Sequence, residues 1–378
     1  MQIPSFLLDQ WLNEYHFSDS PPEYDLASST GPHWKLRELL DLVSEEERAS
    51  LMETELIYSS AEGSVQLREA VAEMHGVSAS EVQVLTGASE ALLVIFANAA
   101  EPGANVVLPF PLFPPTAVVA KMFGLEIRHY HLRPENGFKV EVEEIATLID
   151  KKTKLVLVNS PHNPTGATVT DEECRAIHDL ATEHNIQFVS DEVYHPIYHG
   201  RLTKSAAALP NATTVGSLSK SLALSGTRCG WIIDRNRKRL QAYTDARGYF
   251  TISNPPLAEK FALIAVRNRE RIINITQEIA TANLELLDQF FADNNEHLGW
   301  VRPTGGLTAF PWLTNGGDTR AFCIALAELG VLTAPGDCFA VPSHFRLGFG
   351  VSAKEFDVAL NRITDYIKHS GLRFATSA

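Results

Sequence analysis

The central part of the chain alternates two patterns of hydrophobic and polar positions. Short continuous apolar runs, such as VQVL, NVVLPF and KLVLVN, have the length and composition of buried strands. Between them lie longer segments in which apolar residues recur at helical spacing, for example DEECRAIHDLATEHN. Strands alternating with amphipathic helices indicate βαβ units. We therefore expect an α/β fold with a mostly parallel sheet covered by helices on both faces.

The C-terminal third of the chain has a different pattern. A long amphipathic stretch starts at Pro255, and proline suits the first turn of a helix. Beyond Leu298, short apolar runs alternate with two amphipathic segments, which is typical of a smaller α+β unit. We expect a large domain over residues 46–260. A small domain is expected from residues 1–45 together with residues 261–378.

Composition narrows the class of partner. The 378 residues carry a formal net charge of −14, which opposes broad binding to nucleic acid or to anionic membrane. The chain shows neither a secretory signal nor an apolar run of membrane-spanning length, so a cytoplasmic protein is expected. The four cysteines are isolated, and no cluster has the spacing of a metal site. We expect reduced cysteines and no bound metal.

Polar residues follow several of the predicted strands. Ligands of open parallel sheets bind at the carboxyl ends of the strands, so these positions are candidates for a site. The segment TGASEALL after VQVL combines a glycine turn with a helix start, whose free N–H groups suit an anion. Four predicted strands, VQVL, KLVLVN, IQFVS and ATTVG, are followed by candidate site residues. In chain order these are Gly87, Ala88 and Ser89; His162 and Asn163; Asp191 and Tyr194; and Ser217, Ser219, Lys220 and Arg228.

Each of these groups alone has a simple structural explanation, such as a helix cap, a loop or a surface lysine. Their order along the chain is more specific. NPTG, then DEVY, then SLSK with an arginine eight positions after the lysine, resembles the fold-type I pyridoxal-phosphate (PLP) enzymes of the class I/II aminotransferase superfamily. The resemblance covers nearly the whole chain. It implies the aspartate aminotransferase-like PLP-dependent transferase fold, with a seven-stranded sheet in the large domain.

The resemblance assigns residues to the cofactor ring. Lys220 would bond PLP covalently and later move the substrate's Cα proton. Asp191 would stay ionised and keep the ring nitrogen protonated, which makes the ring an electron sink. Tyr194 and Asn163 would hydrogen-bond the phenolic oxygen of the ring. Phe113, in PFPLFPPT, matches the position of an aromatic residue that stacks on the ring.

The resemblance also assigns the phosphate and the substrate carboxylate. Arg228 would contact the phosphate with two donors, together with the two serines of SLSK and the N–H groups at Ala88 and Ser89. Tyr58 matches a tyrosine that reaches the phosphate of a neighbouring subunit, which implies a homodimer with shared active sites. Arg346, in HFRLGFG, matches the arginine that clamps the α-carboxylate of an amino acid substrate.

The cofactor residues do not choose the reaction, since transamination, elimination, racemisation and cyclisation share one kind of activated Cα. The N-terminal stretch WLNEYHF followed by YDLASSTG resembles the capreomycidine synthase group, as does PGDCF followed by FRLGFG. That group, with the related enduracididine-forming cyclase of guanitoxin biosynthesis, acts on hydroxylated arginine, removes water and closes the guanidine into a ring. The resemblance implies a cyclodehydratase. An ordinary aminotransferase is the alternative.

A cyclodehydratase needs acids that hold the guanidinium and protonate the leaving hydroxyl. The sequence offers His162, Asp25 and Glu62 for this work and does not rank them. Ser29 and Gly31, in the unusual N-terminal stretch, are expected to complete the substrate site. A non-catalytic relative that only binds PLP is a third reading. The presence of the lysine, the aspartate and the arginine of the cofactor motif speaks against it.

Overall fold

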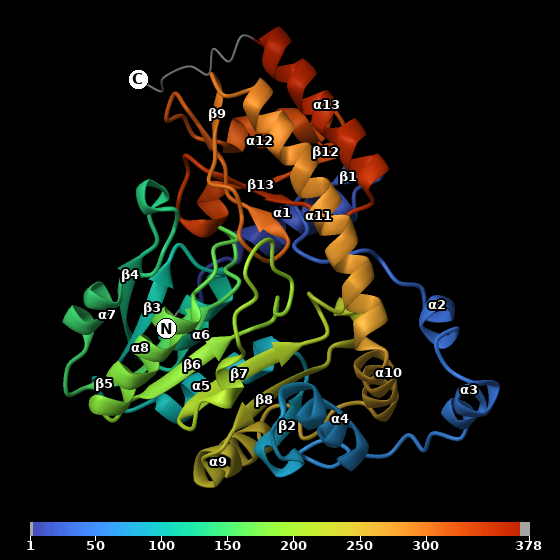
Figure 1. Cartoon of the computed structure of the whole chain (residues 1–378), viewed down its shortest axis with the longest axis vertical. Coiled ribbons are helices and arrows are strands. Elements are labelled where there is room, and N and C mark those ends of the chain that lie inside the picture. Colours follow the sequence, from blue (N-terminus) through green and yellow to red (C-terminus); the bar gives the residue numbers. More distant parts are fainter. Residues whose placement is uncertain (1–2, 371–378) are drawn as a thin grey trace.

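A seven-stranded sheet forms the centre of the molecule (Figure 1). The computed structural model describes residues 3–370. The strands lie in the order β2-β8-β7-β6-β5-β3-β4; β8 is antiparallel to both neighbours, and every other pair is parallel. The predicted fold class is confirmed. The strands are β2 (Val82–Leu85), β3 (Asn105–Phe110), β4 (Glu126–His131), β5 (Thr153–Asn159), β6 (Gln187–Asp191), β7 (Ala212–Ser217) and β8 (Gly230–Asp234).

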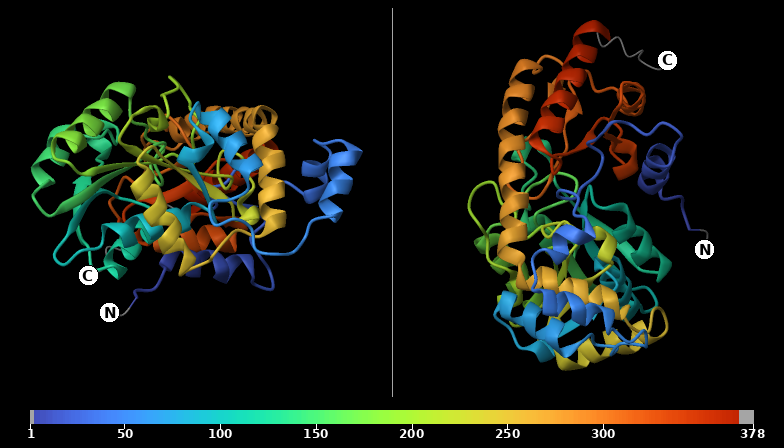
Figure 2. Two further views of the ribbon diagram at one scale, coloured as in Figure 1. Left: turned by 90° about the horizontal axis from the view of Figure 1, so that it is seen from below. Right: turned by 90° about the vertical axis from the view of Figure 1, so that its right-hand side faces the viewer.

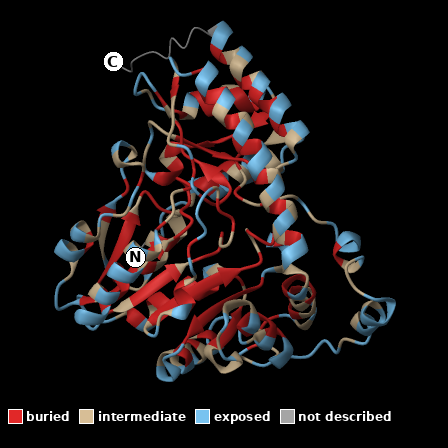
Figure 3. Ribbon diagram, viewed as in Figure 1, coloured by how far each residue is buried: buried red, intermediate tan, exposed pale blue. Residues whose placement is uncertain are grey.

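Side chains of the central strands alternate between two hydrophobic cores. In β5, Leu155 and Leu157 enter the core formed with α5, α6 and α9, whereas Val156 and Val158 enter the core formed with α7 and α8. Because both faces are covered, β3, β5 and β7 are buried at most positions, and Figure 3 shows the middle of the sheet buried. The helices of this region are α4 (Val65–His75), α5 (Ala88–Ala99), α6 (Pro114–Met122), α7 (Val142–Leu148), α8 (Asp171–Glu183) and α9 (Arg237–Gly248).

The helical stretch predicted from Pro255 consists of two consecutive helices. Helix α10 (Pro256–Arg267) ends at Asn268, whose backbone leaves the helical region at φ −101° and ψ 18°. The Asn268 side chain donates to the Ile264 carbonyl at 2.9 Å, which satisfies an end of the first helix. Helix α11 (Arg269–Asp293) then runs from the sheet to the C-terminal unit (Figure 2). Within residues 3–370, none of the helices combines the length and apolarity that a membrane span requires.

The C-terminal unit incorporates the start of the chain. Strand β1 (Tyr24–Asp25) pairs in parallel with β12 (Val331–Leu332), and the Trp11 indole donates to the Thr333 carbonyl at 2.9 Å. The remaining elements of this unit are α1 (Leu7–His16), β9 (Leu298–Gly299), β10 (Thr308–Ala309), β11 (Trp312–Leu313), α12 (Arg320–Glu328), β13 (Ala334–Pro335), β14 (Phe345–Gly348) and α13 (Ala353–Ser370).

Two short helices, which come between β1 and α4 in the chain, extend beside α10 at the right of Figure 1. They are α2 (Leu36–Leu40) and α3 (Glu45–Met52). Leu39 of α2 belongs to the hydrophobic cluster of α4 and α10, but α3 has no buried residue. This segment therefore projects a largely exposed arm from the sheet side of the molecule.

Candidate active site

The polar ends of β5, β6 and β7 meet the first turn of α5 at one pocket of about 210 Å³. These three strands are parallel, so their carboxyl ends share one edge of the sheet. The structure brings together most residues predicted for the cofactor: Ala88, Ser89, Phe113, Asn163, Asp191, Tyr194, Ser217, Ser219, Lys220 and Arg228. The sequence analysis missed four lining residues, which are Leu92, Asn159, Val193 and Ser225.

Hydrogen-bond donors converge at one end of this pocket. Gly87 precedes α5 with φ +83°, and a Cβ at this position would lie 2.7 Å from Arg228 Nη2. Glycine therefore lets the arginine approach the start of the helix. Arg228 is itself left-handed at φ +48°, and its Nη1 donates to the Ser225 carbonyl at 3.0 Å. The Ser217 hydroxyl donates to that of Ser219 at 2.9 Å. Guanidinium, hydroxyls and helix N–H groups together suit a phosphate.

A buried ion pair between Glu90 and Arg247 stabilises the turn before α5, next to this cluster of donors. Glu90, in the first turn of α5, accepts the Thr86 N–H at 2.5 Å and pairs with Arg247 Nε at 3.3 Å. Arg247 is fully buried and also donates to the carbonyls of Ala61 and Val84, at 2.8 and 2.9 Å. Burial lowers the pKa of Arg247, and the charge of Glu90 opposes that shift. The pair fixes the turn before α5 to the strand beneath it.

Lys220 and Asp191 both line the pocket, and their charges influence each other. Burial lowers the pKa of the lysine to about 7; the charge of Arg346 acts in the same direction, and Asp191 opposes it. A large share of Lys220 is thus a neutral amine, the nucleophilic form, near neutral pH. Burial likewise raises the pKa of Asp191 to about 7, against the attraction of the lysine. The expected full ionisation of Asp191 therefore needs an additional cation, such as a pyridinium nitrogen.

Ser29 reaches the lysine from the N-terminal segment. Lys220 Nζ donates to Ser29 Oγ at 2.8 Å, and Ser29 is 8% exposed. The sequence analysis placed this serine in the substrate site. The structure places its hydroxyl at the amine of Lys220, and its part in substrate binding stays a prediction.

Tyr194 presents a buried hydroxyl to the same pocket. Burial raises its pKa to about 12, so the hydroxyl stays protonated. Ser29 lies near this hydroxyl, but no described residue makes a hydrogen bond of good geometry with it. An oxygen of a bound ring could accept a hydrogen bond from the Tyr194 hydroxyl.

Asn159 links the loops that carry Asp191 and Asn163. Its side chain donates to the Asp191 carbonyl at 3.0 Å and accepts the Asn163 N–H at 2.8 Å.

Arg346, on β14, lies beside the pocket and is 2% exposed. Its Nη1 donates to Asn163 Oδ1 at 3.1 Å and its Nη2 to the Ala27 carbonyl at 2.6 Å, whereas Nε has no partner among the described residues. The guanidinium lies over the Phe339 ring at 5.1 Å. Burial lowers its pKa. The arginine thus holds the segment that carries Ser29 and retains a donor for a further acceptor.

The three candidate acids all lie outside the pocket. His162 is 3% exposed, bonds Thr165 Oγ1 at 2.8 Å, and has its pKa lowered to about 3 by burial, so it is neutral and turned away. Asp25 accepts two backbone N–H groups and pairs with His16 at 3.1 Å. Glu62 is exposed and pairs with Arg68 at 3.4 Å.

Two further predicted residues lie away from the pocket. A Cβ at Gly31 would lie 2.9 Å from both Ala223 Cβ and Thr276 Cγ2, so this glycine permits close packing. It lines a separate cavity of about 420 Å³. Tyr58 is 79% exposed in the single chain and lines no cavity of that chain that we describe.

Residues 23–363 match the sequence model of the family Aminotransferase class I and II. The chain belongs to this family. Capreomycidine synthase of Streptomyces vinaceus is 30% identical over 371 residues, which cover 96% of this chain and 94% of that protein. Arginine–pyruvate transaminase of Pseudomonas aeruginosa is also 30% identical, over 329 residues that cover 83% of each chain.

Solved structures agree with this family. An aspartate aminotransferase variant of Thermus thermophilus superimposes with a TM-score of 0.86 at 26% identity, covering 97% of each chain. The PLP-dependent cyclase OrfR gives a TM-score of 0.88 at 26% identity, covering 98% of each chain. The protein is therefore a PLP-dependent enzyme with the aspartate aminotransferase-like fold.

The residues present fit PLP. The cluster of donors at Arg228 and the start of α5 suits the phosphate, and the unpartnered Tyr194 hydroxyl suits the ring oxygen. Asp191 lies in the same pocket as Lys220, so a pyridine nitrogen and an aldehyde each have a matching group. Phe113 lines the pocket and contacts Phe6 edge to face, with ring centroids 6.1 Å apart.

Proposed function

We propose that the protein is a cyclodehydratase that removes water from a hydroxylated L-arginine and closes the guanidine into a ring, giving an enduracididine- or capreomycidine-type product. The observation that carries the proposal is the contact between Ser29 and Lys220, 2.8 Å long. Ser29 belongs to the N-terminal stretch that resembles the capreomycidine synthase group. The match to capreomycidine synthase of S. vinaceus covers 96% of the chain.

The overall reaction is balanced without a second substrate. The hydroxyl leaves with a guanidine hydrogen as water, and a C–N bond replaces the C–O bond. No atom is oxidised or reduced overall. An aminotransferase, in contrast, must pass the amino group to a 2-oxo acid.

The side chains of the site divide this work. When bound, PLP withdraws electrons from the Cα of an amino acid joined to it. The amine of Lys220 removes the Cα proton, and Ser29 orients that amine. Arg346 directs a donor to the substrate α-carboxylate. The Tyr194 hydroxyl would hold the ring oxygen of PLP by a hydrogen bond, and Asp191 would balance the charge of the ring nitrogen.

The guanidine of the proposed substrate needs hydrogen-bond acceptors in the pocket. Asp191 is the only carboxylate that lines the pocket among the described residues, and it serves the cofactor. A carboxylate acceptor for the guanidine would therefore come from a second copy of the chain, whereas amide and main-chain oxygens can come from this one. A carboxylate from the second copy would link the proposed reaction to the proposed dimer.

The second candidate is a class I/II aminotransferase. It is supported by the 30% identity to arginine–pyruvate transaminase of P. aeruginosa, as high as the identity to capreomycidine synthase. An aminotransferase with an arginine-like substrate would use the same pocket. The two candidates differ in whether a 2-oxo acid is consumed.

The assay incubates the holoenzyme with β- or γ-hydroxyarginine, with and without pyruvate, and follows products by mass spectrometry. The cyclodehydratase gives a product lighter by one water in the absence of pyruvate. Formation of alanine from pyruvate, with no loss of water from either substrate, contradicts the proposal and favours the aminotransferase. Lys220→Ala is the control that should remove both products.

We further propose a homodimer in the cytoplasm, in which Tyr58 contacts the phosphate site of the second copy. Tyr58, Ile57 and Leu56 are 79%, 66% and 79% exposed, an apolar run that a partner would cover. Light scattering should therefore give twice the mass of one chain.

A second experiment tests whether the active sites are shared. Mixing Lys220→Ala with Tyr58→Ala protein should restore activity, since a mixed dimer has one intact site. A mixture as inactive as its components contradicts a site shared in this way.

A further inference from the structure

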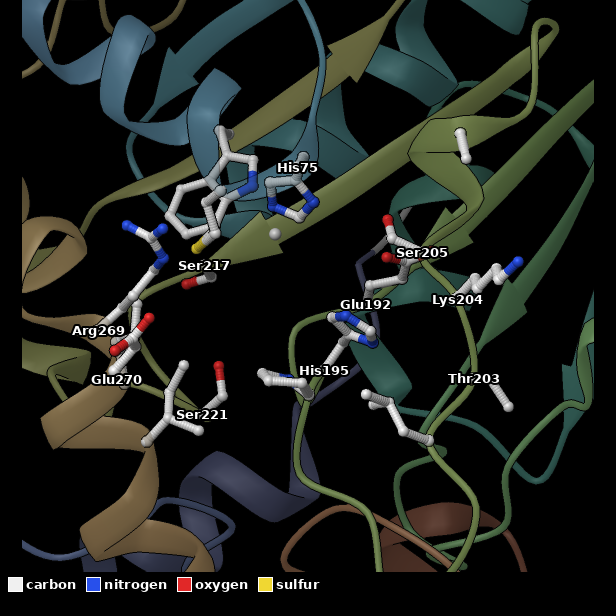
Figure 4. Close-up of a pocket in the computed structure, with 18 of the residues that line it drawn as sticks. His75, Glu192, His195, Thr203, Lys204, Ser205, Ser217, Ser221, Arg269 and Glu270 are labelled. Atoms are coloured by element: carbon white, nitrogen blue, oxygen red, sulfur yellow. The ribbon is translucent and has the colours of Figure 1, made fainter.

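A second and larger cavity lies behind the loop that carries Lys220. It has a volume of about 860 Å³ and is bounded by the end of α4, the start of α11 and the loop over residues 195–208 (Figure 4). We call it the back cavity. Its volume is in the range of sites for small organic ligands, roughly 300–1,000 Å³. Neither the cofactor chemistry nor the proposed reaction uses it.

One short segment separates the back cavity from the cofactor pocket. Ser219 and Lys220 line the cofactor pocket, whereas Ser221 and Leu222 line the back cavity. Ser217 lines both. A molecule in the back cavity would therefore touch the reverse side of the segment that positions the lysine and the phosphate serines.

Ser221 offers a free hydrogen-bonding group to the back cavity. Its residue is 4% exposed, and Figure 4 shows its side chain among those that line the cavity. Within the described part of the chain, the backbone N–H of Ser221 donates to the Val193 carbonyl, but the hydroxyl has no partner. The hydroxyl is not among the enclosed unpaired polar atoms, so it is open to the cavity and available to a ligand or to water.

The lining favours a ligand without net charge. Burial lowers the pKa of His75 and of His195 to about 4, so both imidazoles are neutral at neutral pH. Trp231 and Leu222 supply apolar wall, and the Trp231 ring packs edge to face with that of His75, at 6.1 Å. Basic and acidic side chains are equal in number, three of each, so their formal charges cancel: Arg201, Lys204, Arg269, Asp171, Glu192 and Glu270.

We propose that the back cavity is a second ligand site, which takes a small aromatic molecule of no net charge that bears a hydrogen-bonding group, and that its occupancy is transmitted to Lys220 through residues 217–221. The aromatic ring packs against Trp231 and the neutral imidazoles. The polar group bonds the Ser221 hydroxyl. Binding then restrains the segment that holds the lysine amine, which couples the two sites.

The test uses indole as the probe and the holoenzyme as the protein. Binding is measured by ligand-detected NMR with the active site saturated by a non-reacting amino acid, so that indole reports on another site. Two variants fill the back cavity from opposite sides: Ala208→Trp from the loop and Asn274→Trp from α11, both at exposed lining positions. Ala292→Trp, at the far end of α11, is the matched control.

Indole should bind wild type and Ala292→Trp alike and should bind each filled variant at least about tenfold more weakly. In wild type, indole should also shift the pH midpoint of the visible absorption of bound PLP. Absence of binding to wild type, or unchanged binding in both filled variants, overturns the site. Binding that leaves the absorption midpoint unmoved overturns the coupling to Lys220. Since no product is measured, either failure is distinct from failure of the proposed cyclodehydratase.

Discussion

Ser29 Oγ lies 2.8 Å from Lys220 Nζ, although the two residues are 191 positions apart in the chain. The serine is held there by the segment whose Ala27 carbonyl accepts a hydrogen bond from Arg346. Lys220, Arg346 and the N-terminal segment are thus linked by hydrogen bonds.

Replacing Ser29 by alanine should slow turnover more than it weakens cofactor binding. A hydrogen bond between neutral groups contributes about 0.5–1.5 kcal/mol, so kcat should fall roughly twofold to tenfold. Ser29→Thr keeps the hydroxyl and should recover part of the rate. Steady-state kinetics and a PLP titration check the two effects. Equal rates for the alanine variant and wild type contradict a role at the lysine.

Gly87→Ala should weaken PLP binding, because the added Cβ would lie 2.7 Å from Arg228 Nη2. Gly124→Ala is the control: its φ of +76° is also positive, but nothing lies within 4 Å of its Cβ. Both variants should lose unfolding free energy from the positive φ, and Gly87→Ala should lose more, since a φ of +83° with a ψ of 170° is reached almost only by glycine. Only Gly87→Ala should require more PLP for half saturation, measured by fluorescence titration.

Glu90→Ala should destabilise the protein by about 3–5 kcal/mol, because it leaves Arg247 buried without its carboxylate partner. Glu101→Ala is the comparison, since Glu101 is 65% exposed in its ion pair with Lys154. That change should cost at most about 1 kcal/mol. Urea denaturation of the two variants measures both values. Similar losses in the two would show that the buried pair does not support the turn before α5.

Capture of PLP by the apoenzyme should depend on pH through Lys220. The amine attacks the aldehyde only when neutral, so the rate should rise as pH increases through about 7 and then level off. A lysine at the ordinary pKa of 10.5 would give a rate that keeps rising to that pH. Asp191→Asn removes the charge that favours the ammonium form, so the rise should move to lower pH. Stopped-flow absorbance gives both profiles.

The position of the candidate site at the carboxyl edge of the sheet was predictable, because polar residues stand at the ends of the predicted strands. Asp191 and Ser217 each stand at the end of a short strand-like segment, and parallel strands bring such ends together. His162 was expected in the site because it adjoins Asn163. Neighbouring side chains diverge in the turn, however, and the imidazole bonds Thr165 inside the protein. The sequence thus predicted the loop in which His162 lies but not the direction of its side chain.

The buried ion pair between Arg247 and Glu90 was not predictable from local sequence patterns. Arg247 contacts the Val84 carbonyl across 163 positions, and no periodicity marks such a residue. Arginine in a helix is normally exposed, so the sequence favours a surface position. Only the assembled fold shows that this one is buried beside Glu90.

The pairing of β1 with β12 has a consequence for synthesis of the chain. Trp11 and Thr333, joined by a hydrogen bond, are 322 positions apart. The strand pairing that anchors the N-terminal segment therefore has to wait until residues 331–333 have been synthesised. Contacts of such long sequence separation form late in folding. The sheet and Lys220 can be in place earlier, whereas the segment that carries Ser29 gains this anchor only afterwards.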